Sequence, residues 1–208
     1  MSFTLWFTGL SGAGKTTLSK RVYLEIRRLG YKAEWLDGDL IRANFSQELG
    51  FSKQDRDINV RRLGFISHLL NKNGIVSVVA AISPYREVRE TNRRLLGNYL
   101  EVFCDCSLDA LVARDPKGLY KRALAGEIPN FTGVSDPYEP PLQPDVHART
   151  GQDSVEESFS QVMANLRGRG LLPPEDQCVL CEYGEEDEAA WRTWLADLGY
   201  CRCSGSGK

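Results

Sequence analysis

The sequence lacks a long hydrophobic run. Its longest apolar stretch, residues 75–82, is far shorter than the roughly 20 residues that a membrane-spanning helix needs. The first residues show no basic segment and no cleavage site of the secretory type. We therefore expect a cytoplasmic protein with no membrane association.

The sequence also lacks a strong excess of charge. Its formal net charge is −2, so no general affinity for polyanions is implied and no nucleic acid is expected as a partner. The 208 residues, 42% hydrophobic and 26% charged, suit one soluble α/β domain with a short appendage. Seven arginines cluster locally, and they form either a solvated helix surface or an anion pocket. They are Arg56, Arg61, Arg62, Arg86, Arg89, Arg93 and Arg94.

No internal repeat is present, and strand-like segments alternate with helix-like ones. Strands are expected at residues 3–8, 33–36, 75–82 and 99–104. Helices are expected at residues 15–29, 55–71, 87–96, 108–114, 118–125 and 154–166, the last with Ser154 and Glu157 as a capping box. This alternation predicts a parallel sheet with helices on both faces. Between residues 126 and 144, prolines mixed with aromatics favour an ordered loop or lid over a linker.

Residues 9–16, GLSGAGKT, fill every fixed position of the phosphate-loop pattern G-x-x-x-x-G-K-[ST]. The motif lies between an expected strand and an expected helix, where backbone N–H groups and the helix dipole can bind nucleotide phosphates. Lys15 would contact the β- and γ-phosphates, and the Thr16 hydroxyl would hold Mg²⁺. A glycine turn that matches by chance is the alternative.

A Walker B aspartate is missing from residues 75–82. The carboxylate that helps to hold Mg²⁺, called the metal-side carboxylate below, therefore has to come from another segment. Asp37 and Asp39 follow the second strand, at the sheet edge where ligands bind. One of them could help to order Mg²⁺, and the other could accept a proton from an attacking hydroxyl. Because Asp-Gly is common in turns, a plain turn is the competing interpretation.

Eight motifs occur in the order found in a known enzyme family. They are GLSGAGKTT (9–17), DGDLIR (37–42), LGFS (49–52), DRDINVRR (55–62), ISPYR (82–86), RDPKGLYK (114–121), GEIPNFTG (126–133) and DPYE (136–139). Together they extend over roughly residues 3–172, and this part of the chain resembles adenylylsulfate kinase.

The resemblance implies a P-loop NTPase fold of three α/β/α layers around a mostly parallel five-stranded sheet, with a mobile lid at about 117–144. It implies transfer of the γ-phosphoryl group of ATP, with Mg²⁺, to the 3′-hydroxyl of adenosine 5′-phosphosulfate in sulfate assimilation. The implied catalytic residues are Lys15, Asp37 and Asp39, with Asp39 orienting or deprotonating the hydroxyl. The implied ATP-binding residues are Gly9, Ser11, Gly12, Ala13, Gly14, Lys15, Thr16, Thr17 and Arg114. The implied acceptor-binding residues are Asp39, Leu40, Ile41, Arg42, Phe51, Arg56, Asn59, Ile82, Ser83, Lys117, Asn130 and Phe131.

Three further expectations come from the same resemblance. Ser83 matches a serine that is phosphorylated in some relatives, which suggests a regulatory or intermediate role. A homodimer is expected because relatives are often dimers. Association with an ATP sulfurylase is expected because some relatives are fused to one.

Residues 173–208 extend beyond the usual end of that family, so we expect a domain at 1–172 followed by an acidic extension. Its Cys178, Cys181, Cys201 and Cys203 could bind a structural Zn²⁺, or could stay reduced without metal. Disulfides are disfavoured in the cytosol. Between the two pairs, a helix is expected at about 185–198, with Trp191, Trp194, Leu195 and Leu198 on one face. That face packs on the kinase core or binds a partner.

Two other functions compete with the leading one. The first is another small-molecule P-loop kinase, for a nucleoside monophosphate or a sugar acid, and the lid motif with Asp37, Asp39 and Arg42 disfavours it. The second is a catalytically idle nucleotide-binding scaffold, which the presence of Lys15 and Asp39 disfavours.

Overall fold

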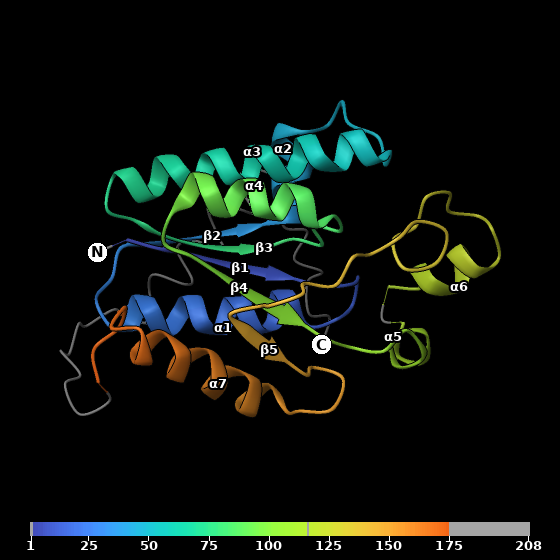
Figure 1. Ribbon diagram of the computed structural model, residues 1–208. Helices are drawn as coiled ribbons and strands as arrows, with labels where there is room; N and C mark the ends of the chain where they lie inside the picture. The colour runs from blue at the N-terminus through green and yellow to red at the C-terminus, as the bar shows by residue number, and fades with distance from the viewer. Residues whose placement is uncertain (1, 116, 175–208) are drawn as a thin grey trace, which may run out of the picture.

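A computed structural model describes residues 2–115 and 117–174. Within them, five parallel strands form one sheet in the order β2-β3-β1-β4-β5. The strands are β1 (Thr4–Thr8), β2 (Ala33–Asp37), β3 (Val76–Ala80), β4 (Tyr99–Cys104) and β5 (Val146–Ala148). The predicted parallel α/β/α architecture is confirmed (Figure 1).

Helices cover both faces of the sheet because the strand side chains alternate between two apolar layers. Leu5 and Phe7 point to one layer, which they share with α1 (Lys15–Arg28) and α7 (Val155–Gly168). Trp6 points to the other layer, which it shares with α3 (Lys53–Lys72) and α4 (Arg86–Leu96). Figure 1 shows these two helix pairs on opposite sides of the strands.

The helix ends follow local capping chemistry. The predicted capping box of α7 is confirmed, since the Ser154 hydroxyl accepts from the backbone N–H of Glu157 and the Glu157 carboxylate accepts from that of Ser154. An equivalent box of Ser52 and Asp55 starts α3 two residues before the predicted position. Each box satisfies N–H groups that the first helical turn leaves unpaired.

Two elements were not predicted, and one strand was predicted too long. The segment after Asp37 forms helix α2 (Gly38–Phe45), and β5 is a three-residue strand at the sheet edge. The strand expected at 75–82 ends at Ala80, and three residues later Ser83 has a left-handed backbone (φ +46°). The lid region contains α6 (Leu119–Leu124), which follows α5 (Leu108–Arg114).

Among the described residues, no helix combines the length and apolarity that crossing a bilayer requires. The four cysteines and two tryptophans of the expected extension, Cys178, Cys181, Cys201, Cys203, Trp191 and Trp194, lie outside the described residues.

Candidate active site

The phosphate loop, residues 9–14, joins β1 to α1. A Cβ atom on Gly9 would clash with the carbonyl oxygen of Cys104, so only glycine lets the loop approach β4 this closely. Gly14 adopts the left-handed conformation (φ +82°) at the N-cap of α1. The start of α1, with its unpaired N–H groups and positive dipole end, therefore borders a cavity of about 290 Å³.

Lys15 is buried at the base of this cavity. Its Nζ donates a hydrogen bond to the carbonyl oxygen of Leu10 at 2.7 Å. Burial is the main cause that lowers the pKa of the ammonium to about 8, and the nearby Cys104, Asp39 and Asp37 oppose that shift. A buried cation with few anionic partners is suited to receive phosphate oxygens.

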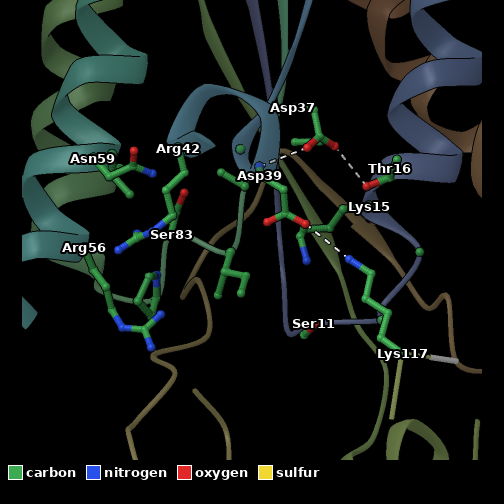
Figure 2. A pocket seen from close by; sticks show the side chains of 18 of the residues that line it. Ser11, Lys15, Thr16, Asp37, Asp39, Arg42, Arg56, Asn59, Ser83 and Lys117 are labelled. Carbon is green, nitrogen blue, oxygen red and sulfur yellow. Dashed lines mark hydrogen bonds and ion pairs between the residues drawn. The ribbon is translucent and has the colours of Figure 1, made fainter. Parts of the chain in front are cut away.

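Asp37 is fixed at the end of β2 by its own role as the N-cap of α2. Its Oδ1 accepts from the backbone N–H groups of Asp39 (2.9 Å) and Leu40 (3.3 Å). Its Oδ2 accepts from the Thr16 hydroxyl at 3.3 Å. Thr16, predicted to hold Mg²⁺, thus lies beside Asp37, one of the two candidates for the metal-side carboxylate, as the dashed line in Figure 2 shows.

Asp39 projects from the first turn of α2 into the cavity, and its side chain is 82% exposed. Lys117, from the lid region, forms an ion pair with it at 3.2 Å. In Figure 2, Lys15 and Lys117 lie on one side of Asp39, whereas Arg42, Arg56 and Asn59 lie on the other. The carboxylate is therefore placed between two groups of polar and cationic side chains.

A second cavity, of about 550 Å³, lies between α2 and the lid and contains the predicted acceptor-binding aromatics Phe51 and Phe131. The guanidinium of Arg42 lies over the Phe51 ring, 4.5 Å from its centroid, and that ring is 58% exposed. Arg56 donates to the carbonyl oxygens of Phe51 (3.0 Å) and Asn130 (2.5 Å), which ties the lid to α3.

The two cavities are continuous. Both are lined by Ser11, Asp39, Arg42, Phe51, Arg56, Ile82 and Lys117. A phosphate cradle therefore leads past Asp39 into a partly aromatic cavity, which is the layout that a donor triphosphate and a second nucleotide would need.

Asn59 and Ser83 complete the wall of the first cavity. The Oδ1 atom of Asn59 is buried without a hydrogen-bond partner among the described residues. The hydroxyl of Ser83 accepts from the indole N–H of Trp6 at 2.9 Å, and the residue is buried. An orphaned carbonyl oxygen beside the cavity is a natural acceptor for a ligand hydroxyl or amine.

Several predicted residues line neither cavity. They are Gly9, Ala13, Leu40, Ile41 and Arg114. Ile41 packs against the core layer of α3 and α4, and Arg114 is directed to the carbonyl oxygens of Thr150 and Gly151. Among residues 2–115 and 117–174, no group of three or more histidine, cysteine or acidic side chains could hold a metal ion.

Sequence reasoning missed two residues that organise the site. Arg89, only 3% exposed, pairs with Glu101 at 2.7 Å and donates to the carbonyl oxygen of Ser83 at 2.6 Å. Tyr120 of α6 donates to the carbonyl oxygen of Ser11 at 2.7 Å and packs edge-on against Phe131. The arginine cluster was the only signal for Arg89, and three of its members, Arg61, Arg86 and Arg94, are exposed.

The parallel sheet, the phosphate loop at the start of α1 and the adjoining acceptor cavity define a P-loop kinase. The family model for adenylylsulphate kinase matches residues 1–149. The chain belongs to that family.

Curated relatives and solved structures agree. An adenylyl-sulfate kinase of Picosynechococcus sp. is 52% identical over 171 residues, which are 82% of this chain and 97% of that protein. A probable bifunctional SAT/APS kinase of Sorangium cellulosum is 49% identical over 85% of this chain and 30% of its own length. The structure of the Mycobacterium tuberculosis APS kinase CysC in complex with AMPPNP and APS superposes with a TM-score of 0.76 at 40% identity, covering 80% of this chain and 98% of that one.

Proposed function

We propose that this protein transfers the γ-phosphoryl group of ATP to the 3′-hydroxyl of adenosine 5′-phosphosulfate, giving 3′-phosphoadenosine 5′-phosphosulfate and ADP. Family membership supports this reaction, because the relatives at about 50% identity carry the name adenylyl-sulfate kinase. The observation that carries the proposal is the continuity of the two cavities, with Asp39 at their junction.

The acceptor cavity suits an adenine nucleotide with two anionic groups. Phe51 and Phe131 offer ring faces and edges to a purine. A guanidinium has five N–H donors, so the contacts of Arg56 to Phe51 and Asn130 leave others for phosphate or sulfate oxygens. Arg42 adds a second guanidinium beside the same ring.

The phosphate cavity suits the donor. Lys15 would bind the β- and γ-phosphates, and its burial would strengthen the attraction between its ammonium and the phosphate oxygens. The Thr16 hydroxyl and the Asp37 carboxylate are hard oxygen ligands 3.3 Å apart, which fits Mg²⁺. When bound there, Mg²⁺ would neutralise charge on the phosphate oxygens.

Asp39 would accept the proton of the acceptor hydroxyl or orient that hydroxyl for attack. Its exposed carboxylate faces the cavity, whereas that of Asp37 is occupied with capping α2 and with Thr16. Lys117 would exchange its ion pair with Asp39 for the transferred phosphoryl group, since an exposed pair of this kind contributes little stability. The lid residues around Phe131 would exclude water from the reacting groups.

The first experiment is an ADP-release assay with ATP, Mg²⁺ and one of three acceptors: adenosine 5′-phosphosulfate, AMP or gluconate. We expect turnover with adenosine 5′-phosphosulfate alone. Turnover with AMP or gluconate instead would favour another small-molecule kinase. No turnover with any acceptor, despite ATP binding, would favour the idle scaffold.

A second experiment tests the role of Asp39. The Asp39→Asn variant should lose about 10²- to 10⁴-fold in kcat, the usual contribution of a general base, while its affinity for ATP is retained. Asp109→Asn, on the exposed first turn of α5, is the matched control and should keep wild-type kcat. Unchanged turnover in Asp39→Asn would remove this residue from the proposed mechanism.

The remaining assignments are also proposals. A homodimer and association with an ATP sulfurylase can be checked by light scattering and by co-purification, and the bifunctional relative supports the second. Cytoplasmic location agrees with the free thiols of Cys104 and Cys106. A structural Zn²⁺ on Cys178, Cys181, Cys201 and Cys203 can be measured as metal content after purification.

A further inference from the structure

A groove of about 750 Å³ lies between α1 and α7, on the side of these helices away from the sheet, and shares no lining residue with the active-site cavities. Its apolar lining comes from Leu24, Phe159, Met163 and Ala164. Leu24 is 41% exposed, although it lies in the middle of a helix whose other apolar residues are mostly buried. An apolar strip of this kind on a helix pair suits the apolar face of a further helix.

The rim of the groove is predominantly basic. Three arginines, Arg21, Arg28 and Arg167, line it together with one acidic residue, Glu25. The guanidinium of Arg21 lies over the Phe159 ring at 4.6 Å and pairs with Glu156 of α7, and Arg28 pairs with Glu25 at 2.7 Å. Glu156 and Glu25 offset two of the three arginines, so the rim keeps a small net positive charge and favours an occupant with an apolar face and acidic rather than basic side chains.

The described part of the chain ends close to this groove. The backbone N–H of Leu171 donates to the carbonyl oxygen of Leu166 in the last turn of α7, and Leu172 is buried in the core layer formed by α1 and α7. Residues 175–208 thus start beside the carboxyl ends of both helices. The ten residues 175–184 can span about 30 Å, enough to reach any point of the groove.

The sequence of that segment matches the groove in charge and in polarity. Residues 178–208 contain six acidic and three basic side chains. The helix expected at about 185–198 would be about 20 Å long and would present Trp191, Trp194, Leu195 and Leu198 on one face.

We propose that residues 175–208 fold back on their own kinase domain and bind in the groove between α1 and α7. The tryptophan face contacts Leu24 and Phe159, and the acidic side chains of the segment lie toward the arginine rim. This intramolecular docking does not depend on the reaction that the active site catalyses.

The test is acrylamide quenching of tryptophan fluorescence in the full-length protein. A full-length W191F/W194F variant gives the background from Trp6 and Trp35, which is subtracted. The wild-type segment tryptophans should be protected from acrylamide at all protein concentrations. Leu24→Glu should lower the ratio of docked to free segment at least about tenfold, since it places a charge where the docked segment would bury an exposed leucine.

Leu69→Glu is the matched control, because Leu69 is 46% exposed on α3, across the sheet from the groove. It should leave the quenching unchanged, and circular dichroism should show that both variants are folded. Three results would overturn the proposal. The segment tryptophans could be quenched freely in the wild type, protected equally in Leu24→Glu, or protected only at concentrations where two chains associate.

Discussion

Burial of Lys15 predicts a proton that is taken up when ATP binds. In the protein alone, desolvation lowers the pKa of this ammonium from 10.5 to about 8. Phosphate oxygens beside the ammonium would raise the pKa again, toward or above its ordinary value. At pH 9 an amine with a pKa of 8 is about one-tenth protonated, so ATP binding should take up about 0.9 proton. At pH 7 it should take up almost none.

The lowered pKa of Lys15 also affects ATP affinity and folding stability. Affinity for ATP should fall about tenfold between pH 7 and pH 9, because protonation of Lys15 then becomes part of binding. In the protein without ATP, the lowered pKa of Lys15 makes folding stability increase with pH, whereas it makes ATP affinity decrease. A lysine with a lowered folded pKa opposes folding below pH 8, and this cost, about 3 kcal/mol, decreases as the pH rises from 8 toward 10.5.

Isothermal titration calorimetry measures the uptake directly, when ATP binding at pH 9 is compared in buffers of different ionisation enthalpy. The slope of the observed enthalpy against buffer enthalpy gives the number of protons. In Lys15→Met the slope should be near zero, and the melting temperature at pH 7 should rise. A slope near zero in the wild type at pH 9 would refute the proposed desolvation of Lys15.

Two more predictions follow from the contacts of the site. Arg89→Met leaves Glu101 buried without its main partner and should lower the free energy of unfolding by about 3–5 kcal/mol in a urea titration. The double variant Arg89→Met/Glu101→Leu should be more stable than the single variant. A loss under about 1 kcal/mol in the single variant would contradict the stabilising role of this pair. Phe51→Ala should raise KM for adenosine 5′-phosphosulfate about 5- to 150-fold, since stacking on a base is worth about 1–3 kcal/mol. KM for ATP should not change. Steady-state kinetics with each substrate varied gives both KM values, and a raised KM for ATP would show that Phe51 has a role other than acceptor binding.

Local sequence patterns were sufficient to predict the strands and helices whose apolar or capping residues follow a clear pattern. The buried strands expected at 3–8 and 75–82 correspond to β1 and to the slightly shorter β3, and the capping box of Ser154 and Glu157 starts α7 where expected. Helix α2 was not predicted because Asp37-Gly38-Asp39 fits both a turn and a helix N-cap. The residues that follow continue as a helix, and Asp37 caps its N-terminus. Strand β5 has only three residues, too few for a period to appear.

The residues that connect distant parts of the site could not be predicted for a different reason. Arg56 was expected to contact the acceptor, and it also holds the carbonyl oxygen of Asn130, which is 74 positions away in the sequence. Arg89 belongs to a helix that looks polar, and its burial depends on Glu101 in β4. A buried arginine is stable only where a partner meets it, and a partner on another strand is set by the sheet topology.

The parallel register explains how Asp37 of β2 can take the place of an acidic residue at the end of β3. Asp37 pairs in register with Ala80, the last residue of β3, so its carboxylate emerges at the same edge of the sheet. Neighbouring strands lie about 4.8 Å apart, so moving the carboxylate from β3 to β2 shifts it sideways by that distance. The first turn of α1 still reaches it, since the Thr16 hydroxyl lies 3.3 Å from Oδ2. Because Asp37 also caps α2, the same helix start fixes this carboxylate, the proposed metal-side ligand, and the neighbouring Asp39. The position of one acidic group is thereby set relative to the other.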